Sequence, residues 1–180
     1  MFFNFIYCGI SVNLKVNLGC PLQCSSFDLC VDMITTPQIS IYNLEDYFGH
    51  ESVNYFYSKN LLEHLGNPLA HIISVKNTLA KGGMYECITD NALFLPFYMK
   101  SLSFLNKFFK YGAFGIHSGV HFNREAGDHF AVFTDAHLKT LFEKAGFSDM
   151  AIEYGTFQFN LERFPYWCLS PRIRVKAVKK

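Results

Sequence analysis

The feature that most constrains the fold of this chain is a helix followed at once by a strand. Asn67-Pro68 predicts a helix start, because Asn can accept hydrogen bonds from the free amides of the first turn and Pro fixes φ at the first helical position. An apolar stripe at helical spacing follows, and Gly82-Gly83 predicts the helix end. The β-prone run 84–89 comes directly afterwards. A helix joined to a strand by so short a loop is the building unit of a parallel sheet with helical crossovers.

Further β-prone runs extend this predicted sheet on both sides of the unit. A second helix is expected from the cap Thr134-Asp135 to Gly146. The last two strands are expected to pair antiparallel, with the basic side chains of the final strand facing solvent and protecting an edge of the sheet. The predicted strands are residues 15–18, 27–31, 39–42, 52–58, 84–89, 147–154 and 172–179. The fold class is therefore α/β, with a mostly parallel sheet and a final antiparallel strand pair.

Length and composition favour one globular domain over residues 1–180. A chain of 180 residues fits a single domain, and 50% apolar residues predict a packed core. The formal charge of +1 gives no electrostatic reason to expect a nucleic-acid partner. Residues 1–14 are expected to form an arm that covers part of the core.

The cysteines and the amino terminus favour a cytoplasmic protein. Six cysteines include no C-x-x-C pair, and Cys30, between Leu29 and Val31, is expected to be a small buried hydrophobic residue. The apolar residues 1–10 precede the first basic residue, Lys15, so they make a poor signal peptide, and they are too few to span a bilayer.

Polar and glycine residues follow the predicted strands at their carboxyl ends, where open α/β sheets bind ligands. Together with the runs 60–65, 79–83 and 129–147, this ordered set resembles the class I S-adenosylmethionine-dependent methyltransferases, in particular the small type 11-like domains. The resemblance covers nearly the whole chain from residue 15. The residues after successive strands are Gly19-Cys20, Asp32, Asn43-Leu44 and Ser58-Lys59-Asn60.

The resemblance implies a three-layer Rossmann-like fold and S-adenosylmethionine as the cofactor. Gly19 would let the backbone approach the cofactor without a Cβ, Asp32 would accept hydrogen bonds from the ribose hydroxyls, and Asn43 and Leu44 would flank the adenine. The full set of cofactor-binding residues implied is Leu18, Gly19, Cys20, Asp32, Met33, Asn43, Leu44, Ser58, Asn60 and Leu61.

Two departures from the family pattern lie beside this site. Pro21 stands where the family usually has a second Gly, and Pro removes an amide donor and fixes φ. Only 11 residues separate Cys20 from Asp32, which leaves little room for the usual first crossover helix. The alternative is therefore an inactive methyltransferase-like protein that serves in binding or assembly.

Methyl transfer from an activated donor depends mainly on alignment, and a base is needed only where the acceptor retains its proton. The candidate bases are His64, which the resemblance places near the donor, and His117, His121 and His129. His117 and His121 bracket a Gly and lack the Glu of the His-Glu-x-x-His pattern, so no metal site is predicted. Lys59 and Glu63 are expected to be solvated or locally paired.

Residues 91–130 are expected to form a helical insertion after the fifth strand. Aromatic residues and lysines at roughly helical spacing over 93–111 predict an amphipathic helix, which either covers the core or caps the acceptor site. Lysines beside an aromatic face would also suit peripheral contact with a membrane surface. The methyl acceptor is expected to be a small molecule, a glycan or a lipid precursor.

Overall fold

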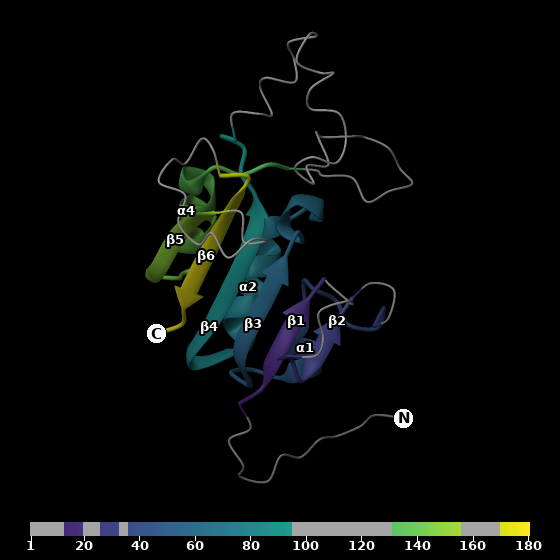
Figure 1. Ribbon diagram of the computed structural model, residues 1–180. Helices are drawn as coiled ribbons and strands as arrows, with labels where there is room; N and C mark the ends of the chain where they lie inside the picture. The colour runs from purple at the N-terminus through teal and green to yellow at the C-terminus, as the bar shows by residue number, and fades with distance from the viewer. Residues whose placement is uncertain (1–12, 20–25, 33–35, 95–130, 156–169) are drawn as a thin grey trace.

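The computed structural model describes residues 13–19, 26–32, 36–94, 131–155 and 170–180 (Figure 1). Within these ranges, six strands form one sheet in the order β2-β1-β3-β4-β6-β5. Neighbouring strands from β2 to β4 pair parallel, whereas β6 runs antiparallel to both β4 and β5. The strands are β1 (Lys15–Leu18), β2 (Leu29–Val31), β3 (Val53–Lys59), β4 (Leu79–Asp90), β5 (Asp149–Gly155) and β6 (Arg172–Val178). The expected α/β class, with its mostly parallel sheet and antiparallel pair, is confirmed.

The α-helices of the described part pack side by side, with α2 (Pro68–Thr78) between α1 (Leu44–Phe48) and α4 (Asp135–Lys144). The side chain of Tyr85 on β4 joins the sheet to this layer, because its ring lies 6.1 Å from that of His71 on α2 and 5.7 Å from that of Phe142 on α4. Burying these apolar and aromatic side chains is the main source of stability of the sheet–helix interface.

The opposite face of the sheet carries a ladder of polar side chains that crosses β3, β4, β6 and β5. The Tyr55 hydroxyl donates to Glu86 at 2.9 Å, and Glu86 lies 3.3 Å from Arg174. Arg174 in turn lies 3.5 Å from Glu153. Phe27 stacks on Tyr55 with a ring separation of 6.2 Å. The two faces of the sheet therefore differ in chemistry.

Several local expectations need correction. Residues 39–42 form a turn and not a strand, because the bonds from Ile39 N to Thr36 O and from Asn43 N to Ser40 O satisfy the backbone locally. The final strand β6 lies inside the sheet, and β5 forms the edge.

Cys30 is the third correction, since it is half-buried and bonded in a disulfide. Alternation along β2 turns Val31 toward the core and Cys30 toward the other face. In the described part of the chain, the buried free thiol is that of Cys87.

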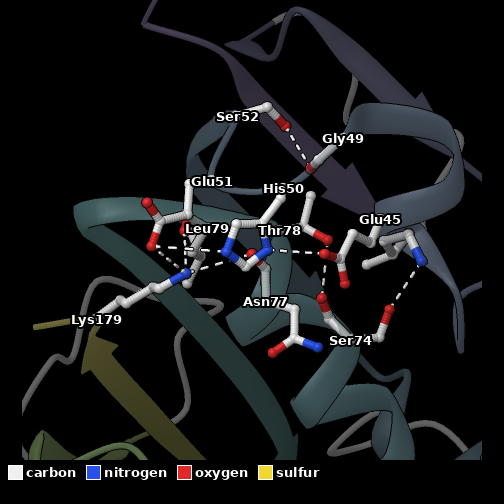
Figure 2. A network of polar contacts seen from close by, with 11 residues as sticks. Glu45, Gly49, His50, Glu51, Ser52, Ser74, Asn77, Thr78, Leu79 and Lys179 are labelled. Atoms are coloured by element: carbon white, nitrogen blue, oxygen red, sulfur yellow. Dashed lines mark hydrogen bonds and ion pairs between the residues drawn. The ribbon is translucent and has the colours of Figure 1, made fainter.

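A network of polar contacts fixes the end of α2 (Figure 2). The Lys179 ammonium donates to the carbonyls of Leu79 at 2.7 Å and Asn77 at 3.3 Å, and it lies 3.3 Å from the Glu51 carboxylate. A cation that occupies the last carbonyls of a helix is a favourable cap. The helix therefore ends at Thr78, earlier than Gly82-Gly83 predicts, and β4 begins at the next residue.

The expected amino-terminal arm 1–14 is described only at residues 13 and 14, and the expected insertion 91–130 only at residues 91–94. The single domain 1–180 remains a prediction. No helix in the described ranges is both long enough and apolar enough to cross a membrane.

Candidate functional site at the carboxyl edge of the sheet

The turn after β1 strongly favours glycine. Gly19 has a φ of +82°, and its N–H donates to Val31 O at 2.8 Å, which ties the ends of β1 and β2 together. A Cβ at this position would lie 2.9 Å from Cδ1 of Leu61, so the Leu61 side chain would have to shift to admit it. Gly19 and Leu61, two members of the expected cofactor-binding set, are therefore in contact, and the backbone after β1 lies directly beside the turn after β3.

Asn60 makes the corresponding turn after β3. Its φ of +55° lies in the left-handed region, which Asn tolerates better than most side chains. Its N–H donates to Ile88 O at 2.9 Å, and its Oδ1 accepts a hydrogen bond from Arg172 Nη1. Arg172 Nη2 also lies 3.8 Å from Asp90 at the end of β4. These bonds join the carboxyl ends of β3 and β4 to the start of β6.

Asp32 follows β2 at the same edge and is half-buried. Thr36 fixes its backbone, because Thr36 Oγ1 accepts from Asp32 N at 2.8 Å and Thr36 N donates to Asp32 O at 2.8 Å. The backbone that carries this carboxylate is therefore held by a local turn.

The loop that precedes α1 is anchored to α2. Leu44 is fully buried, and its N–H donates to Ser74 Oγ at 2.8 Å. Asn43 is exposed and precedes the helix without a side-chain cap bond. Of this expected pair, the structure leaves the Asn43 side chain accessible and places the Leu44 side chain in the core.

A second anchor of this loop is the fully buried His71. Its Nδ1 lies 2.8 Å from Ile41 O, and its Nε2 lies 3.2 Å from the Tyr85 hydroxyl. Burial lowers the pKa of His71 to about 4, so the ring is neutral and donates from Nδ1 to the carbonyl. The Tyr85 hydroxyl also lies 2.8 Å from Ser58 Oγ. The hydroxyl of Ser58, expected at the cofactor site, is thus engaged within the core.

Glu63 is a residue that sequence reasoning missed. It was expected to be solvated or locally paired, yet it is 0% exposed, in the 3₁₀ helix η2 (Leu62–His64). Its Oε2 accepts from Thr89 Oγ1 at 2.7 Å, while its Oε1 is buried and has no hydrogen-bond partner among the side chains and backbone of the described ranges. Burial, and secondarily the charge of Asp90, raises the pKa of Glu63 to about 7. Its position inside the apolar run 61–65 was the one available signal.

Asn91 is a second missed residue, fully buried at the end of β4. Its Nδ2 donates to Ser170 O at 2.7 Å, its N–H donates to Pro171 O at 2.9 Å, and its Oδ1 accepts from Leu93 N at 3.0 Å. One side chain therefore holds together the segments that leave β4 and enter β6.

The structure places the remaining expected residues as follows. Leu18 is buried at the end of β1, and His64 is half-buried in η2, next to Glu63. Within the described ranges, no three His, Cys, Asp or Glu side chains converge as a metal site. The positions that lie outside the described residues are Cys20, Pro21, Met33, His117, His121 and His129.

Comparison with known proteins finds likeness in structure alone. The sequence matches no protein-family profile and no curated protein. A methyltransferase from Thermotoga maritima is similar with a TM-score of 0.62 and 14% identity, over 96% of this chain and 85% of that one. One from Archaeoglobus fulgidus is similar with a TM-score of 0.60 and 11% identity, over 93% of this chain and 86% of that one. Both are named as S-adenosylmethionine-dependent.

A third similar structure contains a bound product. It is a phosphoethanolamine N-methyltransferase from Haemonchus contortus in complex with S-adenosylhomocysteine, with a TM-score of 0.59 and 12% identity. The likeness covers 93% of this chain and 48% of that one. The sheet, with the strand order β2-β1-β3-β4-β6-β5, matches these solved methyltransferases over most of the chain. The chain therefore has the fold of the class I S-adenosylmethionine-dependent methyltransferases.

Proposed function

We propose that this protein is an S-adenosylmethionine-dependent methyltransferase that acts on a small-molecule, glycan or lipid-precursor acceptor. The observation that carries the proposal is the contact between Gly19 and Leu61, which brings the ends of β1 and β3 together at the carboxyl edge of the sheet. Open α/β sheets bind their ligands at this edge.

The residues at this edge fit the parts of the cofactor. Gly19 brings the backbone of the turn to this edge, where the Leu61 side chain takes the place that a Cβ would fill. The Asp32 carboxylate can accept hydrogen bonds from two vicinal hydroxyls of a ribose. Asn43 presents an exposed amide, which can donate to and accept from the edge of an adenine. Asn60 and Leu61 line the turn that faces Gly19.

Bound S-adenosylmethionine would supply a methyl group on a positively charged sulfur, which is already activated for displacement. The contribution of the chain is to orient this group against the acceptor and to keep water out. Where the acceptor retains its proton, His64 is the candidate base in the described part of this edge.

Isothermal titration of the protein with S-adenosylhomocysteine tests the proposal. We expect binding by the wild type, a severe loss for Asp32→Ala and a mild loss for Asn43→Ala. Asp28→Ala is a matched control, because Asp28 lies at the other end of β2 and accepts from Lys15 N at 2.8 Å. Absence of binding at millimolar ligand would refute the proposal, and equal affinities for Asp32→Ala and Asp28→Ala would show that Asp32 has been given the wrong role.

A further inference from the structure

The side chain of Arg172 joins strands that are not neighbours at the carboxyl edge of the sheet. Arg172 is the first residue of β6, and β4 lies between β6 and β3 (Figure 1). Neighbouring strands lie about 4.8 Å apart, so β3 and β6 are about 10 Å apart and a long side chain is needed to join them. The Arg172 guanidinium makes this connection, because Nη1 donates to Asn60 Oδ1 after β3 and Nη2 lies 3.8 Å from Asp90 Oδ1 at the end of β4.

The turn that Arg172 reaches has an unfavourable backbone conformation. Asn60 has a φ of +55°, and a residue other than glycine adopts this left-handed region only at a cost in free energy, which the surrounding contacts must offset. Asn60 N donates to Ile88 O at 2.9 Å, and Asn60 Oδ1 accepts from Arg172. Any residue but proline could make the first bond, so the second is the one that depends on the side chains present.

The turn held in this way meets the end of β1. Parallel pairing sets Leu18 on β1 beside Ser58 on β3, so the two strands end at the same level. Leu61, the second residue of the turn, packs on Gly19, with its Cδ1 2.9 Å from the place that a Cβ would fill. Direct contacts therefore lead from β6, through the turn after β3, to Gly19.

The guanidinium is well suited to hold this turn. The Arg172 side chain is 12% exposed, and that of its partner Asp90 is 14% exposed, so water competes little for either. A guanidinium presents its N–H groups in a planar fork that can serve two acceptors at once, whereas the ammonium of a lysine is a point charge on a flexible stem. Pairing with Asp90 therefore orients Arg172 toward Asn60.

We infer that Arg172 is a positioning residue for cofactor binding, which holds the turn of Asn60 and Leu61 in its left-handed conformation against Gly19. This inference rests on the proposed function. Arg172 acts on the cofactor through the backbone of this turn. Without the guanidinium the turn would also populate other conformations, and a ligand would bind only the fraction of molecules in the competent one.

Isothermal titration with S-adenosylhomocysteine tests the inference by comparing Arg172→Met with Arg174→Met. Arg174 is a matched control, because it lies two residues further along β6, is 17% exposed and pairs with Glu86 and Glu153 in the polar ladder. Arg172→Met should weaken binding about tenfold, the effect of losing one hydrogen bond from a charged donor, and Arg174→Met should retain the wild-type affinity. Arg172→Lys should recover part of the loss, because its ammonium can donate to Asn60 Oδ1. Urea unfolding of each variant confirms that folded proteins are compared.

A double substitution tests the route through Asn60. Asn60→Gly removes Oδ1 and introduces a residue that adopts a positive φ readily, so this variant should bind S-adenosylhomocysteine and should not respond to Arg172→Met. The inference would be overturned, with the proposed function left standing, by equal affinities for Arg172→Met and Arg174→Met, by loss of binding in Asn60→Gly, or by an effect of Arg172→Met that persists in Asn60→Gly. Failure of the wild type to bind S-adenosylhomocysteine would overturn both.

Discussion

Replacing Glu63 by Gln should make the protein more stable above neutral pH. The amide has the shape of the carboxyl group and can still accept the hydrogen bond from Thr89 Oγ1, so the packing around η2 is preserved. The amide cannot ionise, and it therefore removes the cost of placing a negative charge at a fully buried position. Its Nε2 takes the place of Oε1, and the cost of burying these N–H groups is the same at every pH, so it does not alter the pH-dependent part of the difference.

The size of the effect follows from the raised pKa of Glu63, about 7 against an ordinary value of 4.5. Between these values the folded protein retains a proton that the unfolded chain has lost, so the stability of the wild type falls as the pH rises through this window. Each unit of difference between the pKa in the folded protein and the pKa in the unfolded chain corresponds to about 1.4 kcal/mol of stability. From pH 5 to pH 8, Glu63→Gln should gain about 2 to 3 kcal/mol relative to the wild type.

Urea unfolding of both proteins at several pH values between 5 and 8 measures this gain. Only the difference between the two proteins is informative, because His71 opposes Glu63. The pKa of His71 is lowered to about 4, so it contributes stability that is present above pH 6.5 and is lost as the pH falls toward 4. A difference between wild type and variant that stays constant from pH 5 to pH 8 would show that Glu63 ionises without penalty, and the argument from its burial would fail.

Two further predictions concern side chains that fasten the helical layer. Lys179→Met should lower the free energy of unfolding by about 1 to 3 kcal/mol, because it leaves the carbonyls of Asn77 and Leu79 without their donor. Urea unfolding at pH 7 measures this loss. A similar loss for Lys180→Met, at an exposed position, would show that Lys179 has no specific role. His71→Phe retains an aromatic ring but leaves Ile41 O unpaired. It should lower the free energy of unfolding by about 2 kcal/mol at pH 7. The loss should be smaller at pH 4.5, because the wild type has itself lost stability there. A cost that does not shrink at low pH would show that His71 is not held neutral.

The elements that could be predicted are those whose ends are determined by neighbouring residues. Asn67 Oδ1 accepts from Ala70 N at 3.1 Å, and Thr134 Oγ1 accepts from His137 N at 3.2 Å, as the capping patterns indicate. Gly146 has a φ of +90°, as a helix terminator requires. Each of these bonds spans three residues, so the sequence around it is sufficient to find it.

The candidate site depends on partners that lie far apart in the chain. Gly19 and Asp32 could be predicted because strand ends in an α/β sheet converge on one edge. Glu63 meets Thr89 from 26 residues away, and Asn91 meets Ser170 from 79 residues away. No local pattern distinguishes such a buried Glu or Asn from a solvated one, so these residues become visible only once the fold is known.

The prediction that β6 lies at the sheet edge is wrong, and the reason shows what an alternating pattern of polar and apolar residues along a strand can indicate. The run Arg172–Val178 alternates basic and apolar residues, a pattern that predicts a sheet edge, yet β6 lies between β4 and β5. Its basic side chains belong to the polar ladder, with Arg174 facing Glu86 and Glu153 across the two neighbouring strands. The central strand β4 alternates in the same way around Tyr85, Glu86 and Cys87, of which the first and third are buried. Alternation therefore indicates that the two faces of a strand meet different surroundings, and it leaves open whether the strand lies at the edge or at the centre of the sheet.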